Sequence, residues 1–185
     1  MSIATEKLLT AEEFARLPDP PDESRQELVR GVIETMPPAG GWHGVCCAKV
    51  MRLIGKFVDE SNVGTATSNN SGIVIDRDPD TVRGPDVAFW SKERLPEIPE
   101  GYIEVPPDLV VEVVLPSDHF SRINRKIREY LDKGVRLVWV VDPKDRSVTV
   151  YCPGRGNLML TEKDTLDGEM VLPGFSCRVA DLFPG

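Results

Sequence analysis

Two carboxylates occupy positions in apolar segments that otherwise have the composition of core strands. Asp86 directly precedes the apolar run from Val87 to Trp90, and Glu112 interrupts a second run from Leu109 to Leu115. An ionised carboxylate buried without a partner costs several kcal/mol, so each position needs an arginine, a lysine or a metal ion close by. The sequence therefore predicts a charged site where two core strands meet.

A lysine on the following segment is the cation best placed to reach these acids. The apolar spacing from about His119 to Lys133 predicts an amphipathic helix, and Lys126 lies only about 40° beyond the edge of its apolar face. Two carboxylates and an ammonium group that converge at strand ends can hold Mg²⁺ or Mn²⁺ and orient a water molecule for hydrolysis of a phosphodiester. The alternative is a purely structural ion pair between Lys126 and Glu112.

Helical and strand patterns alternate along the chain and predict an α/β fold. Apolar residues at helical spacing predict a long helix from His43 to about Glu60, and a hairpin is expected from Gln26 to Met36. Further strands are expected at "LVWVVD", "SVTVYC", "LML" and "EMVL". At 185 residues the chain has the size of one domain, residues 1–185, with a central mixed sheet flanked by helices.

Charge and hydropathy exclude several classes of protein. The chain has 22 Lys plus Arg against 30 Asp plus Glu, and the formal net charge of −8 argues against a general nucleic-acid coat or a binder of anionic membranes. No apolar segment has the length of a membrane span, and the N-terminal residues lack the pattern of a signal peptide, so we expect a cytoplasmic protein. A basic strip on the predicted helix is either a solvated face or a surface for the DNA backbone; it comprises Arg122, Arg125, Lys126, Arg128 and Lys133.

Cysteine and histidine usage predicts an oxygen-ligated metal. The four cysteines show no C-x-x-C spacing, so they indicate neither a zinc site nor a disulfide framework and are expected to be small core residues. The two histidines, His43 and His119, lie far apart in the sequence, which argues against a histidine-rich transition-metal site.

Several segments together resemble a known family. "GPDVAFW", "PPDLVVEVVLPSD", "RKIREYLDKGV" and "LVWVVDP" are similar to the Uma-type restriction endonuclease family, a bacterial branch of the PD-(D/E)XK nuclease superfamily. The resemblance spans roughly residues 10–183. It implies a restriction-endonuclease-like core, Mg²⁺-dependent hydrolysis of phosphodiester bonds in DNA, with Mn²⁺ as a possible substitute, and a homodimer.

The resemblance implies roles for particular residues. Asp86 matches the PD element and Glu112 matches the second acid, so both are expected to bind the metal, with the backbone carbonyl of Val113 as a further candidate ligand. The superfamily places its lysine two residues after the second acid, where this chain has Val114. Uma-type proteins instead resemble this chain in carrying the lysine on a helix, in a K-x-x-x-Y pattern that Lys126 matches.

Three further residues have open roles. Glu27, in "QELVRG", matches an acid of the family and is a possible additional metal ligand. His43 also fits the family, although a histidine at the start of a helix is commonly a cap or a surface residue. Arg83 is expected either to pair with Asp86 or to contact a phosphate.

Two other functions remain open beside a DNA endonuclease. A nuclease fold that only binds DNA or a protein partner is favoured by Val114 at the position of the motif lysine and by the acidic net charge. A phosphoesterase that acts on small nucleotides would need the same acids and metal. Nuclease assays with and without a divalent cation distinguish these functions.

Overall fold

The computed structural model describes residues 7–22 and 24–185 and contains a six-stranded mixed sheet in the order β10-β9-β8-β7-β6-β3. Its strands are β3 (Gly64–Ser68), β6 (Val87–Ser91), β7 (Leu109–Val113), β8 (Leu137–Asp142), β9 (Ser147–Tyr151) and β10 (Leu158–Thr161). Strands β7 and β8 are parallel, and the other neighbouring pairs are antiparallel. The predicted α/β fold with a central mixed sheet is confirmed.

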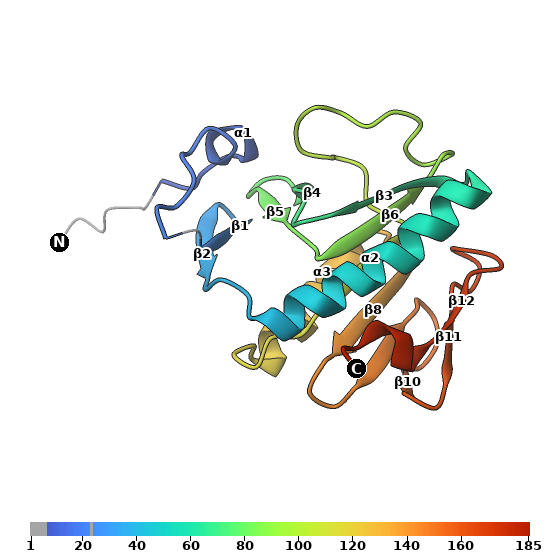
Figure 1. Ribbon diagram of the computed structural model, residues 1–185. Coiled ribbons are helices and arrows are strands. Elements are labelled where there is room, and N and C mark those ends of the chain that lie inside the picture. Colours follow the sequence, from blue (N-terminus) through green and yellow to red (C-terminus); the bar gives the residue numbers. More distant parts are fainter. Residues whose placement is uncertain (1–6, 23) are drawn as a thin grey trace.

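Two helices cover opposite faces of this sheet (Figure 1). Helix α2 (Gly41–Ser61) packs through Val50 and Ile54 against the face that carries Val111, and helix α3 (Phe120–Asp132) packs through Ile127 against the other face. Alternate side chains of a strand point to opposite faces of the sheet, so each side chain of β7 faces either helix α2 or helix α3.

A smaller antiparallel sheet lies beside the larger one and has the order β2-β1-β5-β4. Its strands are β1 (Arg25–Val29), β2 (Val32–Met36), β4 (Ile73–Asp76) and β5 (Thr81–Arg83). The predicted hairpin is β1 and β2, and the turn between them uses positive φ angles at Arg30 and Gly31. The short helix α1 (Ala11–Phe14) begins with a capping box between Thr10 and Glu13.

The C-terminal segment forms a two-stranded sheet of β11 (Thr165–Asp167) and β12 (Ser176–Arg178), followed by the 3₁₀ helix η1 (Val179–Leu182). The expected strand at "EMVL" is wrong. This segment is a local turn in which the Leu172 amide donates to the Gly168 carbonyl, and Leu172 is buried without being part of a sheet. Burial, rather than sheet pairing, accounts for its apolar composition.

Within residues 7–22 and 24–185, no helix combines the length and the apolar character needed to cross a lipid bilayer.

Candidate active site

Glu112 projects from β7 toward helix α3, where it meets a lysine and a tyrosine. The Lys126 Nζ lies 2.9 Å from the Glu112 carboxylate, and the Tyr130 hydroxyl donates to Glu112 Oε1 at 2.7 Å. Lys126 and Tyr130 are four residues apart and therefore share one face of the helix. Lys126 does not point to bulk solvent, since the residue is only 9% exposed.

A second acid approaches the same ammonium group from the smaller sheet. Glu27 Oε1, on β1, lies 3.0 Å from Lys126 Nζ and also accepts a hydrogen bond from the Gly84 amide. Its other oxygen accepts from Arg83 at 2.8 Å. Burial by itself raises the pKa of Glu27, but the charges of Lys126 and Arg83 outweigh burial and lower this pKa to about 2. Glu27 is therefore held as a carboxylate at neutral pH.

Asp86 is held in place where β6 begins. Its Oδ2 accepts a hydrogen bond of 2.7 Å from the Val113 amide, which ties it to the end of β7. Its Oδ1 lies 3.2 Å from Arg25 Nη1 and 3.3 Å from His43 Nε2. Burial raises the pKa of Asp86, but the hydrogen bond and charge of His43 and the Val113 amide outweigh burial and lower it overall. One carboxylate oxygen is thus fixed by the backbone while the other faces Arg25 and His43.

One small cavity lies between Asp86, Glu112 and Lys126. Asp86, Glu112, Val113, Lys126 and Arg25 all contribute to its lining. Its volume of about 30 Å³ is enough for a species of the size of a water molecule. The predicted acids and lysine, which come from separate strands and a helix, are therefore brought together around a single space.

Acids and cations both line this cavity, and they shift one another's pKa. Burial raises the pKa of Glu112, Lys126 opposes that shift, and the charges of Asp86 and Glu27 reinforce it. Lys126 is correspondingly held in its charged form, because its two acidic neighbours outweigh its burial and raise its pKa. A divalent cation near Asp86 and Glu112 would relieve the repulsion between the acids, and their oxygens are the donors that Mg²⁺ and Mn²⁺ prefer.

The expected pairing of Arg83 with Asp86 is wrong. Arg83 is completely buried and binds Glu27 and Glu129, with its Nη2 only 2.5 Å from Glu129 Oε2. Arg25, which sequence reasoning did not single out, lies beside Asp86 instead. Arg83 therefore cannot contact a phosphate in this arrangement and serves to position Glu27.

Cys47 is a second residue that sequence reasoning missed. The cysteines were expected to be core residues, and Cys46 is buried in the core, but Cys47 lies beside His43 with its Sγ 3.4 Å from Nδ1. The spacing of four residues within a predicted helix was the available signal. His43, Cys47 and Asp86 bring three ligand atoms within 4.8 Å of one another, a mixed donor set that the expectation of an all-oxygen site did not include.

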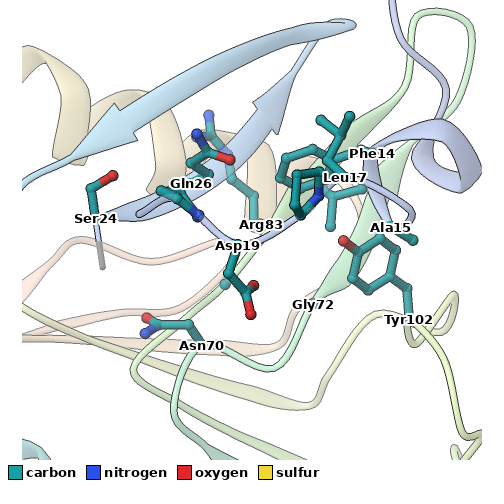
Figure 2. Close-up of a pocket in the computed structure, with 14 residues that line it drawn as sticks. Phe14, Ala15, Leu17, Asp19, Ser24, Gln26, Asn70, Gly72, Arg83 and Tyr102 are labelled. Atoms are coloured by element: carbon teal, nitrogen blue, oxygen red, sulfur yellow. The ribbon is translucent and has the colours of Figure 1, made fainter. Parts of the chain in front are cut away.

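A separate pocket lies on the side of the smaller sheet near helix α1 (Figure 2). Figure 2 shows Phe14 and Tyr102 on one side of it and Ser24 and Asn70 on the other. Its volume is about 220 Å³, and the described residues that line it do not include either strand acid. This pocket is therefore not the space around which the predicted site residues converge.

Comparison with known proteins agrees with this architecture. None of the proteins with curated descriptions matches the sequence significantly. The structure is similar to one described as "Crystal structure of a putative nuclease belonging to DUF820 from Anabaena variabilis ATCC 29413", with a TM-score of 0.79 and 22% sequence identity, covering 95% of this chain and 97% of that chain. At this level of identity the likeness establishes the fold.

The sequence profile of the Uma2 family, described as "Putative restriction endonuclease", matches residues 11–180. This range includes β1, β6, β7 and α3, the four elements that carry Glu27, Asp86, Glu112 and Lys126. The chain therefore belongs to the Uma2 family.

Proposed function

We propose that this protein is a cytoplasmic, metal-dependent endodeoxyribonuclease that hydrolyses phosphodiester bonds in DNA. The observation that carries the proposal is the position of the Lys126 ammonium, 2.9 Å from Glu112 in a cavity that Asp86 also lines. Val114 occupies the position of the usual strand lysine, yet an ammonium group is present at the strand acids. The site thus has all three charged groups that such hydrolysis requires.

The donor set fits a hard divalent cation. We propose Asp86 Oδ1 and a Glu112 oxygen as ligands, with the Val113 carbonyl as a further candidate. Bound Mg²⁺ or Mn²⁺ would supply Lewis-acid stabilisation of the phosphoryl group and lower the pKa of a bound water molecule. The Val113 amide holds Asp86 by its other oxygen, so the ligand oxygen is oriented before any cation binds.

Lys126 acts, in this proposal, on the attacking water or on the negative charge that develops in the transition state. Its two acidic neighbours keep it protonated, so its role is to orient and to stabilise charge rather than to accept a proton. Glu27 positions the ammonium from the side of the smaller sheet, and Tyr130 holds the Glu112 carboxylate.

The DNA backbone would approach along the exposed face of helix α3. A groove of about 550 Å³ is lined there by His119, Arg122, Arg125 and Arg128 together with Glu34. Arg122 also lines the small cavity, so the basic groove borders the proposed site. Such a local strip can bind phosphates although the whole chain is acidic. We also propose a homodimer, as the family resemblance implies, which light scattering would test.

A nuclease assay tests the proposal directly. Supercoiled plasmid, linear duplex and single-stranded DNA are each incubated with Mg²⁺, Mn²⁺ or EDTA. We expect cleavage of DNA that requires the cation and is lost in Asp86→Asn and Glu112→Gln. Turnover of small nucleotides without cleavage of any DNA would favour the phosphoesterase instead.

A binding module without catalytic activity is the second candidate. The ion pairs of Lys126 favour this candidate. The ammonium group is paired with both Glu27 and Glu112, and a purely structural role would explain both pairs. In that case DNA would bind with salt-dependent affinity and no cation would produce cleavage. The same assay, combined with a filter-binding titration, separates the two functions.

A further inference from the structure

The side of Asp86 that faces helix α2 carries a second set of ligand atoms, which shares Asp86 Oδ1 with the proposed oxygen site. His43 and Cys47 lie one helical turn apart, and both side chains face the beginning of β6. His43 Nε2 lies 3.3 Å from Asp86 Oδ1, and Cys47 Sγ lies 3.8 Å from Nε2. All three donor atoms fall within 4.8 Å of one another.

Two of these separations are compatible with a tetrahedral metal centre. In a tetrahedron, adjacent ligands at Zn²⁺ bond lengths are about 3.3 to 3.4 Å apart for N···O and about 3.5 to 3.6 Å apart for N···S. The observed distances of 3.3 and 3.8 Å match within a few tenths of an ångström. Helix α2 and the start of β6 therefore already place two of the three donor pairs at distances close to those of a bound metal.

The surroundings leave room for an ion to enter and for a fourth ligand. The three side chains line a pocket of about 510 Å³, which Met51 and Asn70 also border. Arg25 competes for Asp86 Oδ1, but its Nη1 also binds Asn70 Oδ1 at 3.0 Å and can keep that partner when the carboxylate is taken. Three protein ligands with an open fourth position are the arrangement of exchangeable and catalytic zinc sites.

We propose that His43, Cys47 and Asp86 form a second cation site, which takes a transition metal of the Zn²⁺ class in preference to Mg²⁺. Imidazole and thiolate are ligands that Zn²⁺ and Co²⁺ favour and that Mg²⁺ does not. Formation of the bond between the metal and Sγ releases the thiol proton of Cys47 to the solvent. The thiolate and Asp86 together neutralise the charge of the divalent ion. This site does not depend on nuclease activity.

The test is a titration of the metal-free protein with Co²⁺, followed by absorption spectroscopy and calorimetry. We expect one Co²⁺ per chain, with a thiolate-to-cobalt charge-transfer band in the near ultraviolet that Zn²⁺ abolishes by displacement and an equal concentration of Mg²⁺ does not. Cys47→Ala should lose the band and should bind Zn²⁺ more weakly by a factor on the order of 10² or more. Cys47→Ser, with nearly the same side-chain volume, should also lose the band.

Two matched variants identify the site. Cys152→Ala removes another partly buried free thiol and should keep the band. Glu112→Gln removes a ligand of the proposed oxygen site and should keep it as well. Co²⁺ binding without a thiolate band, equal Zn²⁺ affinity in Cys47→Ala, or no binding by the parent would overturn the proposal. A failure of DNA cleavage would affect only the nuclease proposal, because these readouts need no substrate.

Discussion

Replacement of Lys126 by methionine separates the catalytic and structural roles of the ammonium. In the structure the Lys126 ammonium lies 2.9 Å from the Glu112 carboxylate and 3.0 Å from the Glu27 carboxylate. Glu27 keeps Arg83 after the replacement, whereas Glu112 keeps only the Tyr130 hydroxyl. The loss of folding stability should therefore come mainly from Glu112, whose carboxylate loses its ion pair. Removal of one partner from a buried ion pair typically costs about 3 to 5 kcal/mol, and we expect Lys126→Met to lose this much free energy of unfolding at neutral pH.

The pH dependence of this loss follows from the sign of the pKa shift. Burial already raises the pKa of Glu112, and removal of the Lys126 charge raises it further. A carboxyl group whose pKa is raised on folding favours the folded state most below its ordinary pKa and loses that contribution as pH rises. The deficit of Lys126→Met should therefore be smaller at pH 4.5 than at pH 8, and Mn²⁺ should reduce it at pH 8.

Cleavage provides the second measurement. Single-turnover cleavage of plasmid DNA, at equal concentrations of folded protein, should fall by a factor on the order of 10² or more in Lys126→Met. Lys56→Met is the matched control, because Lys56 lies on helix α2 away from the proposed site and groove. Its side chain is 71% exposed and pairs with Glu60, so the change should cost about 0 to 1 kcal/mol. Equal cleavage by the two variants would refute a catalytic role for Lys126 and favour the binding module.

Three further predictions concern the neighbours of Lys126. The fall of the pKa of Glu27 from 4.5 to about 2 corresponds to about 3 kcal/mol of folding stability, which should be present above pH 4.5 and lost as pH falls toward 2. Urea unfolding should therefore show Glu27→Gln less stable than the parent by an amount that shrinks as the pH is lowered. A difference that stays constant with pH would contradict this prediction. Asp86→Asn and Glu112→Gln should each weaken Mn²⁺ binding by a factor on the order of 10 or more in calorimetry; unchanged affinity would remove them as ligands. Tyr130→Phe should cost about 1.5 to 3 kcal/mol, because a buried carboxylate loses a donor, and should reduce cleavage less than Lys126→Met does.

The parts of the site that lie close together in sequence could be predicted from it. Strand alternation placed Glu112 on the same face as Val110 and Val114, and helical phase placed Lys126 near the apolar face of the following helix. Both inferences use the periodicity of single elements, and only 14 residues separate the two. Because the connection between β7 and α3 is short, the two side chains can meet with few further constraints on the chain.

Contacts that depend on pairing between distant strands could not be predicted. The partner of Arg83 is decided by the pairing of β1 with β5, in which Leu28 lies opposite Val82. No local pattern encodes that register, so the sequence suggested Asp86 or a phosphate and not Glu27. The contact of Cys47 with Asp86 similarly requires the packing of α2 against the larger sheet, although the helical spacing of His43 and Cys47 was visible.

The absence of the strand lysine has a physical explanation in the packing of the larger sheet. Val114 follows Glu112 by two residues, faces helix α3 and packs against the apolar cluster around Ile127. Val114 also borders the site cavity, and Lys126 places its ammonium beside Glu112 from across the interface. Electrostatic stabilisation depends on where the charge lies relative to the reacting atoms and not on which element carries it. The helix position also gives the ammonium a second acidic neighbour, Glu27, which fixes its direction toward the strand acids.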